Sequence, residues 1–294
     1  MLNRYKHLIP IFLLITLALI WGSSFILMKL GLEVFSAVQV GTLRMVIAFL
    51  CLLPLTFSAA KKVSKKDWFW ITISGLTGNG IPAILFATAE IKLSSSVAGV
   101  LNSLTPIFAL LIAALFYQQK FGGIKIAGIF LGFAGAVMLS VFQSNGAIDP
   151  DYSYALLIVA ACVCYGISVN VIKYELQGIP TLAISSLALA AIGPICAVYL
   201  FGVTDFTARL SMPGSGQALG AIILLGAFGS AVSLILFNQL VKVSTVIVAS
   251  SVTYLIPIVA LVWGIVAGES LGMPQLLGMI TILAGIYLIN RKKQ

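Results

Sequence analysis

The sequence has little charge and few side chains that bind metals or perform catalysis. Only 9% of its 294 residues are Asp, Glu, Lys or Arg, whereas a soluble domain carries about 25%. His7 is the single histidine, which argues against histidine-based metal sites and Ser-His catalysis. No cluster of nucleophile, base or metal ligands lies near a predicted membrane interface, as an enzyme acting on lipids would need. We therefore expect no metal, no cofactor and no enzymatic activity.

Apolar residues make up 61% of the chain, and the connections between apolar runs leave little room for a soluble domain. A helix that crosses about 30 Å of hydrocarbon needs roughly 20 apolar residues. The sequence therefore predicts an all-α membrane protein with ten transmembrane helices. Their approximate ranges are 8–29, 36–57, 68–90, 94–117, 122–143, 153–173, 180–203, 216–240, 244–267 and 272–290.

Positive charge is distributed unequally between the two predicted sides of the membrane. If the N-terminus is cytoplasmic, only Lys29, Lys92 and Arg209 of the 17 basic residues fall outside, and Arg44 falls within a span. Basic residues favour the cytoplasmic side, so we expect a multi-pass protein of the plasma membrane, a bacterial inner membrane, with both termini cytoplasmic. The net charge of +9 follows from this placement, and we expect lipid rather than nucleic acid as its surroundings.

The second half of the sequence repeats the first at a nearly constant spacing. Each predicted half, 1–145 and 146–294, contains five spans. Because five is odd, the second half must begin on the opposite side of the membrane, which predicts two inverted five-helix repeats. The matching pairs are Trp21 and Tyr165, Ser24 and Ser168, Lys29 and Lys173, Gly75 and Gly226, Gly78 and Gly229, Phe86 and Phe237, Pro106 and Pro257, Gly128 and Gly278, and Gly135 and Gly285.

Several of these segments resemble the ten-helix, EamA-like branch of the drug/metabolite transporter superfamily. The resemblance is carried by Trp21-Gly-Ser-Ser-Phe25, by Arg44, by the Pro106 and Pro257 segments and by the closing glycine pairs. It implies a carrier that moves small metabolites outward, often amino acids or related compounds, through a cavity between the two halves. It does not identify the substrate.

Polar and aromatic side chains share faces of the predicted spans and are candidates for binding substrate. The alternative for the polar ones is hydrogen bonding between helices, worth about 0.6 kcal/mol per contact. For Trp21 and Tyr165 the alternative is anchoring at the membrane interface, and for Asn79 it is capping of a local helix break. The candidates are Trp21, Ser24, Asn79, Phe86, Asn102, Tyr165, Ser230, Ser233, Phe237 and Tyr254.

Prolines lie near the middle of the fourth and ninth predicted spans, at Pro106 and Pro257. A proline in a soluble helix interior costs roughly 3 kcal/mol, but a membrane helix tolerates it where the freed backbone groups face protein or a watery cavity. We interpret both prolines as kinks that act as hinges beside a central cavity, rather than as ligand contacts.

Arg44 and Glu90 are the charged residues singled out within the predicted spans. Arg44 suits either an anionic substrate group or a structural pair with an acid or helix-end carbonyls. No acid lies at the centre of any predicted span, which favours diffusion or exchange of neutral or zwitterionic solutes. Glu90, near the outer end of its span, leaves proton coupling open.

We therefore expect a secondary transporter, working as a monomer, that exports amino acids or related metabolites by alternating access. The alternative is an exporter of drugs or lipophilic cations on the same fold, in which cavity aromatics work with Glu90. A channel fits less well, because two inverted halves with hinges suit alternating access better than a permanent pore.

Overall fold

The computed structural model describes residues 8–61, 63–119, 122–141, 152–244, 246, 249, 251–268 and 272–290. Within these ranges the regular secondary structure is helical, without a strand. Seven helical segments are long and apolar enough to cross a membrane, and three shorter apolar helices, Gly123–Gly135, Leu255–Val266 and Leu276–Gly285, fall in the remaining predicted spans. The all-α membrane fold is confirmed, and the structure is consistent with ten crossings.

The first half consists of nine helical elements that form the first five predicted spans. They are α1 (Leu8–Leu32), α2 (Ala37–Ala60), α3 (Lys65–Gly75), η2 (Leu76–Gly80), α4 (Ile81–Ala89), α5 (Ser95–Leu101), η3 (Asn102–Leu104), α6 (Thr105–Tyr117) and α7 (Gly123–Val141).

The second half follows the same order, with one additional short helix, α10, between spans. Its described elements are α8 (Ser153–Tyr174), α9 (Thr181–Gly202), α10 (Phe206–Arg209), α11 (Ser215–Gly226), η4 (Ala227–Val232), α12 (Ser233–Val243), η5 (Ser251–Tyr254), α14 (Ile256–Val266) and α15 (Met273–Asn290). The predicted boundary between 145 and 146 lies outside the described residues.

Local sequence explains where several helices begin. Ser36 caps α2, and the Gln39 side chain accepts a hydrogen bond from the Ser36 backbone N–H. Ser64 and Asp67 form the same reciprocal arrangement at the start of α3. Each such box satisfies backbone donors that would otherwise lack partners at a helix N-terminus.

Four spans are interrupted, at equivalent places in the two halves. The third and eighth contain π-helical turns, η2 and η4, and the fourth and ninth contain 3₁₀ turns, η3 and η5. Pro106 and Pro257 each lie in the first turn of the helix that resumes, where a missing N–H removes no intrahelical bond. The predicted helix breaks are therefore present, whereas motion about the prolines stays a prediction.

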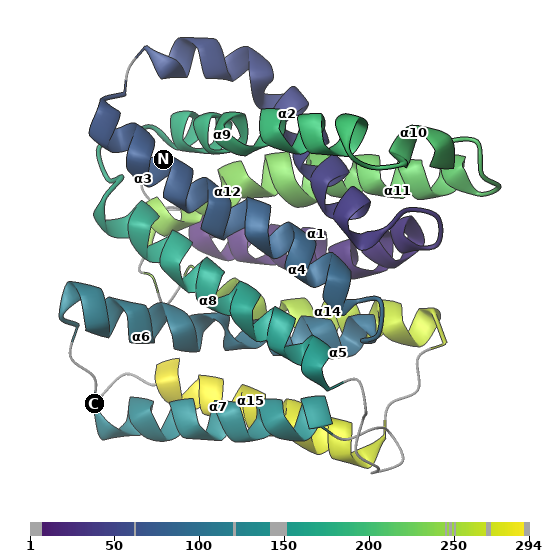
Figure 1. The fold of residues 1–294 in the computed structure, drawn as a ribbon. Helices are drawn as coiled ribbons and strands as arrows, with labels where there is room; N and C mark the ends of the chain where they lie inside the picture. The colour runs from purple at the N-terminus through teal and green to yellow at the C-terminus, as the bar shows by residue number, and fades with distance from the viewer. Residues whose placement is uncertain are drawn as a thin grey trace.

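The last helix of each half, α7 and α15, packs against its counterpart at one edge of the bundle (Figure 1). A Cβ atom on Gly135 would lie 2.6 Å from the Ile282 backbone nitrogen, and one on Gly285 would lie 2.5 Å from that of Gly132. The glycines let two backbones approach closely, as small residues do between membrane helices. These glycine pairs thus serve packing within the chain.

Candidate substrate-binding cavity

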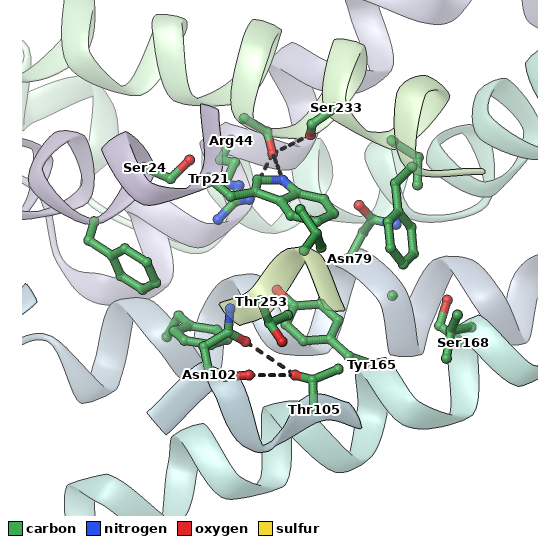
Figure 2. A pocket seen from close by; sticks show the side chains of 18 of the residues that line it. Trp21, Ser24, Arg44, Asn79, Asn102, Thr105, Tyr165, Ser168, Ser233 and Thr253 are labelled. Atoms are coloured by element: carbon green, nitrogen blue, oxygen red, sulfur yellow. Dashed lines mark hydrogen bonds between the residues drawn. The ribbon is translucent and has the colours of Figure 1, made fainter. Parts of the chain in front are cut away.

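A cavity lies between the two halves, and its empty space together with the open space at its mouth is about 880 Å³. Its wall is built from α1, α2, α4, α6, α8 and α12 and from all four interrupted turns. Figure 2 shows the labelled polar and aromatic side chains gathered around it. The lining residues are Trp21, Ser24, Phe25, Met28, Arg44, Gly78, Asn79, Phe86, Asn102, Thr105, Tyr165, Ser168, Val169, Ile172, Gly229, Ser233, Leu234, Phe237, Val252 and Thr253.

Two aromatic pairs form apolar parts of this wall. The rings of Trp21 and Phe237 lie 5.2 Å apart at 57°, and those of Tyr165 and Phe86 lie 6.0 Å apart at 29°. Both separations suit attractive contact between aromatic rings. Trp21 and Phe86 belong to the first half, and Tyr165 and Phe237 belong to the second, so each pair joins one half to the other. The cavity therefore has an aromatic surface contributed by both halves.

The Gly229 carbonyl, in the π-helical turn η4, accepts three hydrogen bonds at the cavity wall. The donors are Trp21 Nε1 at 3.1 Å, Arg44 Nη2 at 3.2 Å and Ser233 Oγ at 2.7 Å. A π-helical turn interrupts regular α-helical bonding and is frequent at functional sites. The indole of Trp21 is therefore held in the cavity wall by a hydrogen bond to the other half of the chain.

Arg44 is held by a second hydrogen bond, from its Nε to Ser230 Oγ at 2.6 Å. Ser230 does not line the cavity and is only 1% exposed. A guanidinium carries five N–H donors in a rigid fork, so bonds to Ser230 and Gly229 fix its direction while Arg44 still lines the cavity. The structure thus supports both readings of Arg44, since the residue is paired with a carbonyl and also faces the cavity.

The charge of Arg44 has no counterpart in the second half. Its repeat position is Ala188, whose carbonyl would lie 2.8 Å from a Cβ atom on Gly75. A Cβ atom on Gly226, the repeat equivalent of Gly75, would likewise lie 3.0 Å from the Arg44 carbonyl oxygen. The backbone packing is therefore repeated in the two halves, whereas the positive charge is present in the first half only.

The two 3₁₀ turns meet beside the cavity. Ser103 Oγ donates to the Thr253 carbonyl at 2.8 Å, which joins η3 to η5. Thr105 Oγ1 donates to the Asn102 carbonyl at 2.8 Å and lies 3.3 Å from Asn102 Oδ1 (Figure 2). The Asn102 amide is therefore presented to the cavity by a hydroxyl that immediately precedes Pro106.

Repeat-related serine and glycine residues approach each other on both sides of the cavity. A Cβ atom on Gly78 would lie 2.4 Å from Ser168 Oγ, and one on Gly229 would lie 2.8 Å from Ser24 Oγ. Ser168 Oγ is itself 3.1 Å from Ser74 Oγ and donates to the Ser74 carbonyl at 3.2 Å. A side chain at either glycine would therefore force the serine hydroxyl of the facing helix to move.

Gly78→Ala should lower the unfolding temperature of the purified protein, because overpacking typically costs about 1–3 kcal/mol. Adding Ser168→Ala removes the closer contact and leaves only the Ser168 Cβ, 3.1 Å from the new methyl group. We expect the double variant to recover part of the lost stability, so that the two effects are not additive. Thermal unfolding of the four proteins measures this coupling, and strictly additive losses would contradict the packing explanation.

The structure brings nine of the fourteen predicted site residues together, and four of the other five lie elsewhere. Trp21, Ser24, Asn79, Phe86, Asn102, Tyr165, Ser233, Phe237 and Arg44 line the cavity. Ser230 lies behind Arg44, Glu90 lines a different space, and the prolines are buried in helix packing. The side chain of Tyr254 lies outside the described part of the structure.

Other lining residues were absent from the predicted set. Thr105 carries a weak sequence signal, a hydroxyl next to a midspan proline. Ser168 and Thr253 occupy repeat positions matching Ser24 and Asn102, so the repeat was enough to find them. Phe25 and Met28 carry no such signal, because large apolar residues in a membrane helix also face lipid or pack in the core.

A second hollow, which we call the charged recess, lies where α1 and α4 end, on the predicted outer side. Its empty volume is about 1230 Å³. It gathers the three predicted outer bases, Lys29, Lys92 and Arg209, together with Glu33 and Glu90. The remaining lining residues are Leu32, Phe35, Ser36, Ala37, Ile91, Leu93 and Ser94.

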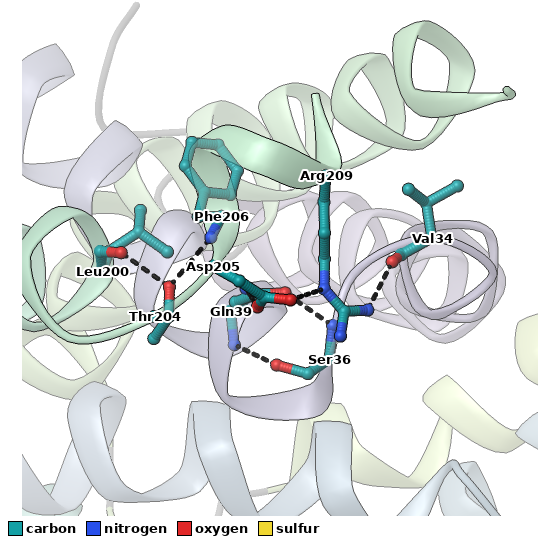
Figure 3. Close-up of polar contacts among 8 residues, drawn as sticks. All are labelled: Val34, Ser36, Gln39, Leu200, Thr204, Asp205, Phe206 and Arg209. Carbon is teal, nitrogen blue, oxygen red and sulfur yellow. Dashed lines mark hydrogen bonds and ion pairs between the residues drawn. The ribbon is translucent and has the colours of Figure 1, made fainter. Parts of the chain in front are cut away.

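One edge of the charged recess is fixed by polar contacts around Asp205 (Figure 3). Asp205 Oδ1 accepts from Gln39 Nε2 at 2.7 Å, and its Oδ2 accepts from Arg209 Nε at 2.9 Å. Arg209 Nη1 also donates to the Val34 carbonyl at 2.9 Å. These bonds join α10 to the turn between α1 and α2. The hydrogen bond from Arg209, aided by that from Gln39, holds the pKa of Asp205 below its ordinary value.

The Asp205 contacts predict a small dependence of stability on pH. A carboxylate whose pKa is lowered in the folded state stabilises the protein fully above its unfolded pKa, about 3.9, and loses this contribution as pH falls through the folded value. We expect Asp205→Asn to lower the unfolding temperature at neutral pH and to match the native protein in strong acid. The effect is small, because the Asp205 side chain is 61% exposed and water screens such pairs. A difference in unfolding temperature that does not change with pH would contradict this account.

Comparison with known proteins finds similarity to transporters along nearly the whole chain. The model described as "EamA-like transporter family" matches residues 8–141 and again 152–291. An "Uncharacterized transporter" of Archaeoglobus fulgidus is 26% identical over 277 residues, which cover 93% of this chain and 95% of that protein. The "Uncharacterized inner membrane transporter YedA" of Escherichia coli K12 is 25% identical and covers 99% and 94%.

A relative from Streptantibioticus cattleyicolor is named "Probable terminal-alkyne amino-acid exporter". It is 24% identical over 277 residues, which cover 92% of this chain and 90% of the relative. Among solved structures, one titled "Crystal structure of protein" superposes with a TM-score of 0.68 over 95% of both chains, at 16% identity. That similarity shows the fold alone.

Proposed function

The chain belongs to the EamA-like transporter family and is a membrane transporter, and from this premise we propose that it exports amino acids or closely related metabolites by alternating access. Export is proposed across the plasma membrane of a bacterium, by a monomer with both termini in the cytoplasm. The inverted repeats, 1–145 and 146–294, are proposed to exchange roles as the cavity turns from one side of the membrane to the other.

The observation that carries the substrate class is the fixed guanidinium of Arg44 in the wall of the central cavity. A planar guanidinium matches the geometry of a carboxylate and binds it with two parallel hydrogen bonds. No Asp or Glu is among the described residues that line the cavity. The cavity therefore favours a solute with a carboxylate over one whose only charge is positive.

The rest of the wall suits the other parts of an amino acid. Asn79, Asn102 and Thr253 contribute neutral polar groups, which can accept hydrogen bonds from an ammonium group. The pair of Trp21 with Phe237 and that of Tyr165 with Phe86 offer apolar surface for a side chain. A Streptantibioticus relative named as a probable amino-acid exporter supports the same substrate class.

The alternative, an exporter of lipophilic cations, has less support from the geometry. The cavity aromatics could attract a cation, but Arg44 opposes one at the same wall. The acid that this alternative requires, Glu90, lines the charged recess and not the central cavity. We therefore keep cation export as an outcome of the test below.

Counterflow in proteoliposomes tests the proposal. Vesicles are loaded with unlabelled amino acids, and entry of the labelled compounds is followed. We expect transient accumulation with the native protein and a large loss with Asn102→Ala. Asn238→Ala is a matched control, because its Nδ2 donates to Ser185 Oγ at 2.9 Å in helix packing away from the cavity. Accumulation of a lipophilic cation, with no accumulation of amino acids, would overturn the proposed substrate class.

A further inference from the structure

Two pairs of helices lead away from the central cavity toward opposite ends of the bundle. The first pair is α1 and α4. Phe25 on α1 and Phe86 on α4 line the cavity and meet edge to face, with ring centroids 5.9 Å apart at 61°. One helical turn further on, Lys29 and Glu90 line the charged recess. Residues four apart share a helix face, so the same faces of α1 and α4 border first the cavity and then the recess.

The second pair is α8 and α12, at the opposite end. Val169 on α8 and Phe237 on α12 line the cavity. Four residues after Val169, Lys173 Nζ donates to the Val241 carbonyl at 3.2 Å and to the Ser244 carbonyl at 2.6 Å. Both carbonyls belong to the C-terminal end of α12, where a cation is stabilised by the helix dipole. Lys173 therefore links α8 to the C-terminal end of α12 by hydrogen bonds.

The two lysines hold the same position in the sequence repeat. Lys29 matches Lys173, and the end of α4 at Glu90 and Leu93 matches the end of α12 at Val241 and Ser244. Leu93 lines the charged recess together with Lys29 and Glu90. Each lysine thus lies on the first helix of its half, beside the end of the third span of that half. The two positions differ in chemistry, since only the α4 end offers a carboxylate.

We call the contact between α1 and α4, and that between α8 and α12, the two seams. Both are small compared with the other contacts of α1 and α8. The main neighbours of α1 are α11, α12 and α14, whereas its contact with α4 is small. The main neighbours of α8 are α4 and α6, and its contact with α12 is smaller. Helices that share little buried surface can separate without disrupting the core that each forms with other neighbours.

We propose that Lys29 and Lys173 are the gating residues of the transport path. Lys173 closes the α8–α12 seam toward the predicted cytoplasm by binding the carbonyls that end α12. Lys29 closes the α1–α4 seam toward the predicted exterior at Glu90 and the end of α4. Substrate then leaves between α1 and α4, past Phe25 and Phe86, into the charged recess. This inference rests on the proposed alternating access, but not on the identity of the substrate.

Distances between paired spin labels test the two gates without substrate. In a background that lacks the native cysteines, labels at Glu33→Cys and Ile91→Cys report the α1–α4 seam. Labels at Gln177→Cys and Val243→Cys report the α8–α12 seam, and all four native side chains are exposed. An unfavoured state of a transporter is ordinarily populated at roughly 0.1–10%. Because a hydrogen bond from a charged group is worth about one factor of ten in an equilibrium constant, we expect Lys173→Met to raise the long-distance population of the α8–α12 pair about tenfold. We expect Lys29→Met to do so for the α1–α4 pair.

Two controls separate gating from a general loss of charge. Lys66→Met removes an exposed lysine at the predicted cytoplasmic face and should leave both distances unchanged. Lys173→Arg retains donors for the α12 carbonyls and should restore the short distance. If Lys173→Met leaves the α8–α12 distance unchanged in folded protein, or if Lys66→Met changes it equally, the gating assignment is wrong.

The same preparations distinguish failure of the gates from failure of the proposed function. Normal amino acid counterflow together with unchanged distances in both variants would overturn the gating assignment alone. Distances that shift as expected, without counterflow of any amino acid in the native protein, would support the gates and overturn the substrate class.

Discussion

Replacing Arg44 by methionine should reduce amino acid counterflow by at least about thirtyfold. Removing one member of a hydrogen-bonded charge pair at a desolvated site costs about 2–5 kcal/mol, and each 1.4 kcal/mol is a factor of ten. The guanidinium lines the cavity in a direction fixed by Ser230 and Gly229. A solute that uses its carboxylate for binding loses that contact in the variant.

Two comparisons make the Arg44 result specific. Ser230→Ala keeps the charge but removes the acceptor of the Arg44 Nε hydrogen bond, so we expect a smaller loss, about tenfold, from net hydrogen-bond energies near 1.5 kcal/mol for charged groups. Arg44→Lys keeps the charge without the planar fork and should fall between the native protein and Arg44→Met. If Arg44→Met folds and still transports amino acids at the native rate, Arg44 has a structural role only.

The second large effect is expected far from the cavity, at the crossing of α7 and α15. Gly135→Ala would place a methyl group 2.6 Å from the Ile282 nitrogen and 2.7 Å from the Gly278 carbonyl oxygen. Both are backbone atoms, so no side-chain rotation can relieve the clash and the helices must move apart. We expect a loss of about 1–3 kcal/mol or more in unfolding free energy, measured as a lower unfolding temperature in detergent.

Gly123→Ala, at the start of α7, is the matched control for this effect. A Cβ atom there meets nothing within 4 Å, and replacing glycine by alanine in a helix is ordinarily neutral or stabilising. Equal unfolding temperatures for Gly135→Ala and Gly123→Ala would mean that α7 and α15 can separate at no cost.

The apolar runs and the repeated sequence were sufficient to predict the fold class, and the predicted residues include nine of the twenty that line the cavity. Phe86 and Phe237 occupy matching positions, as do Trp21 and Tyr165, and all four line the cavity. The sequence did not reveal that Trp21 meets Phe237 while Tyr165 meets Phe86. Such pairing joins residues more than 70 positions apart and depends on how whole helices pack.

Two of the predicted residues, Ser230 and Glu90, are not among those that line the cavity, each for a local reason. Ser230 was expected on a cavity-facing stripe, but it lies within the π-helical turn η4, where the wider turn shifts the phase of the helix. Ser230 consequently supports Arg44 from behind. Glu90 follows the last residue of α4, beyond the contact of Phe25 with Phe86, and so lines the charged recess. A stripe drawn with ideal helical spacing cannot anticipate the shift at Ser230.

The hydrogen bond from Ser103 to the Thr253 carbonyl has a consequence for how tightly the membrane stays sealed. It ties the break in one proline-containing span to the break in the other, so neither span can bend alone without losing a buried bond. We therefore expect the two bends to occur together, which prevents a state that is open at both ends. Such a carrier would not dissipate ion gradients during its cycle.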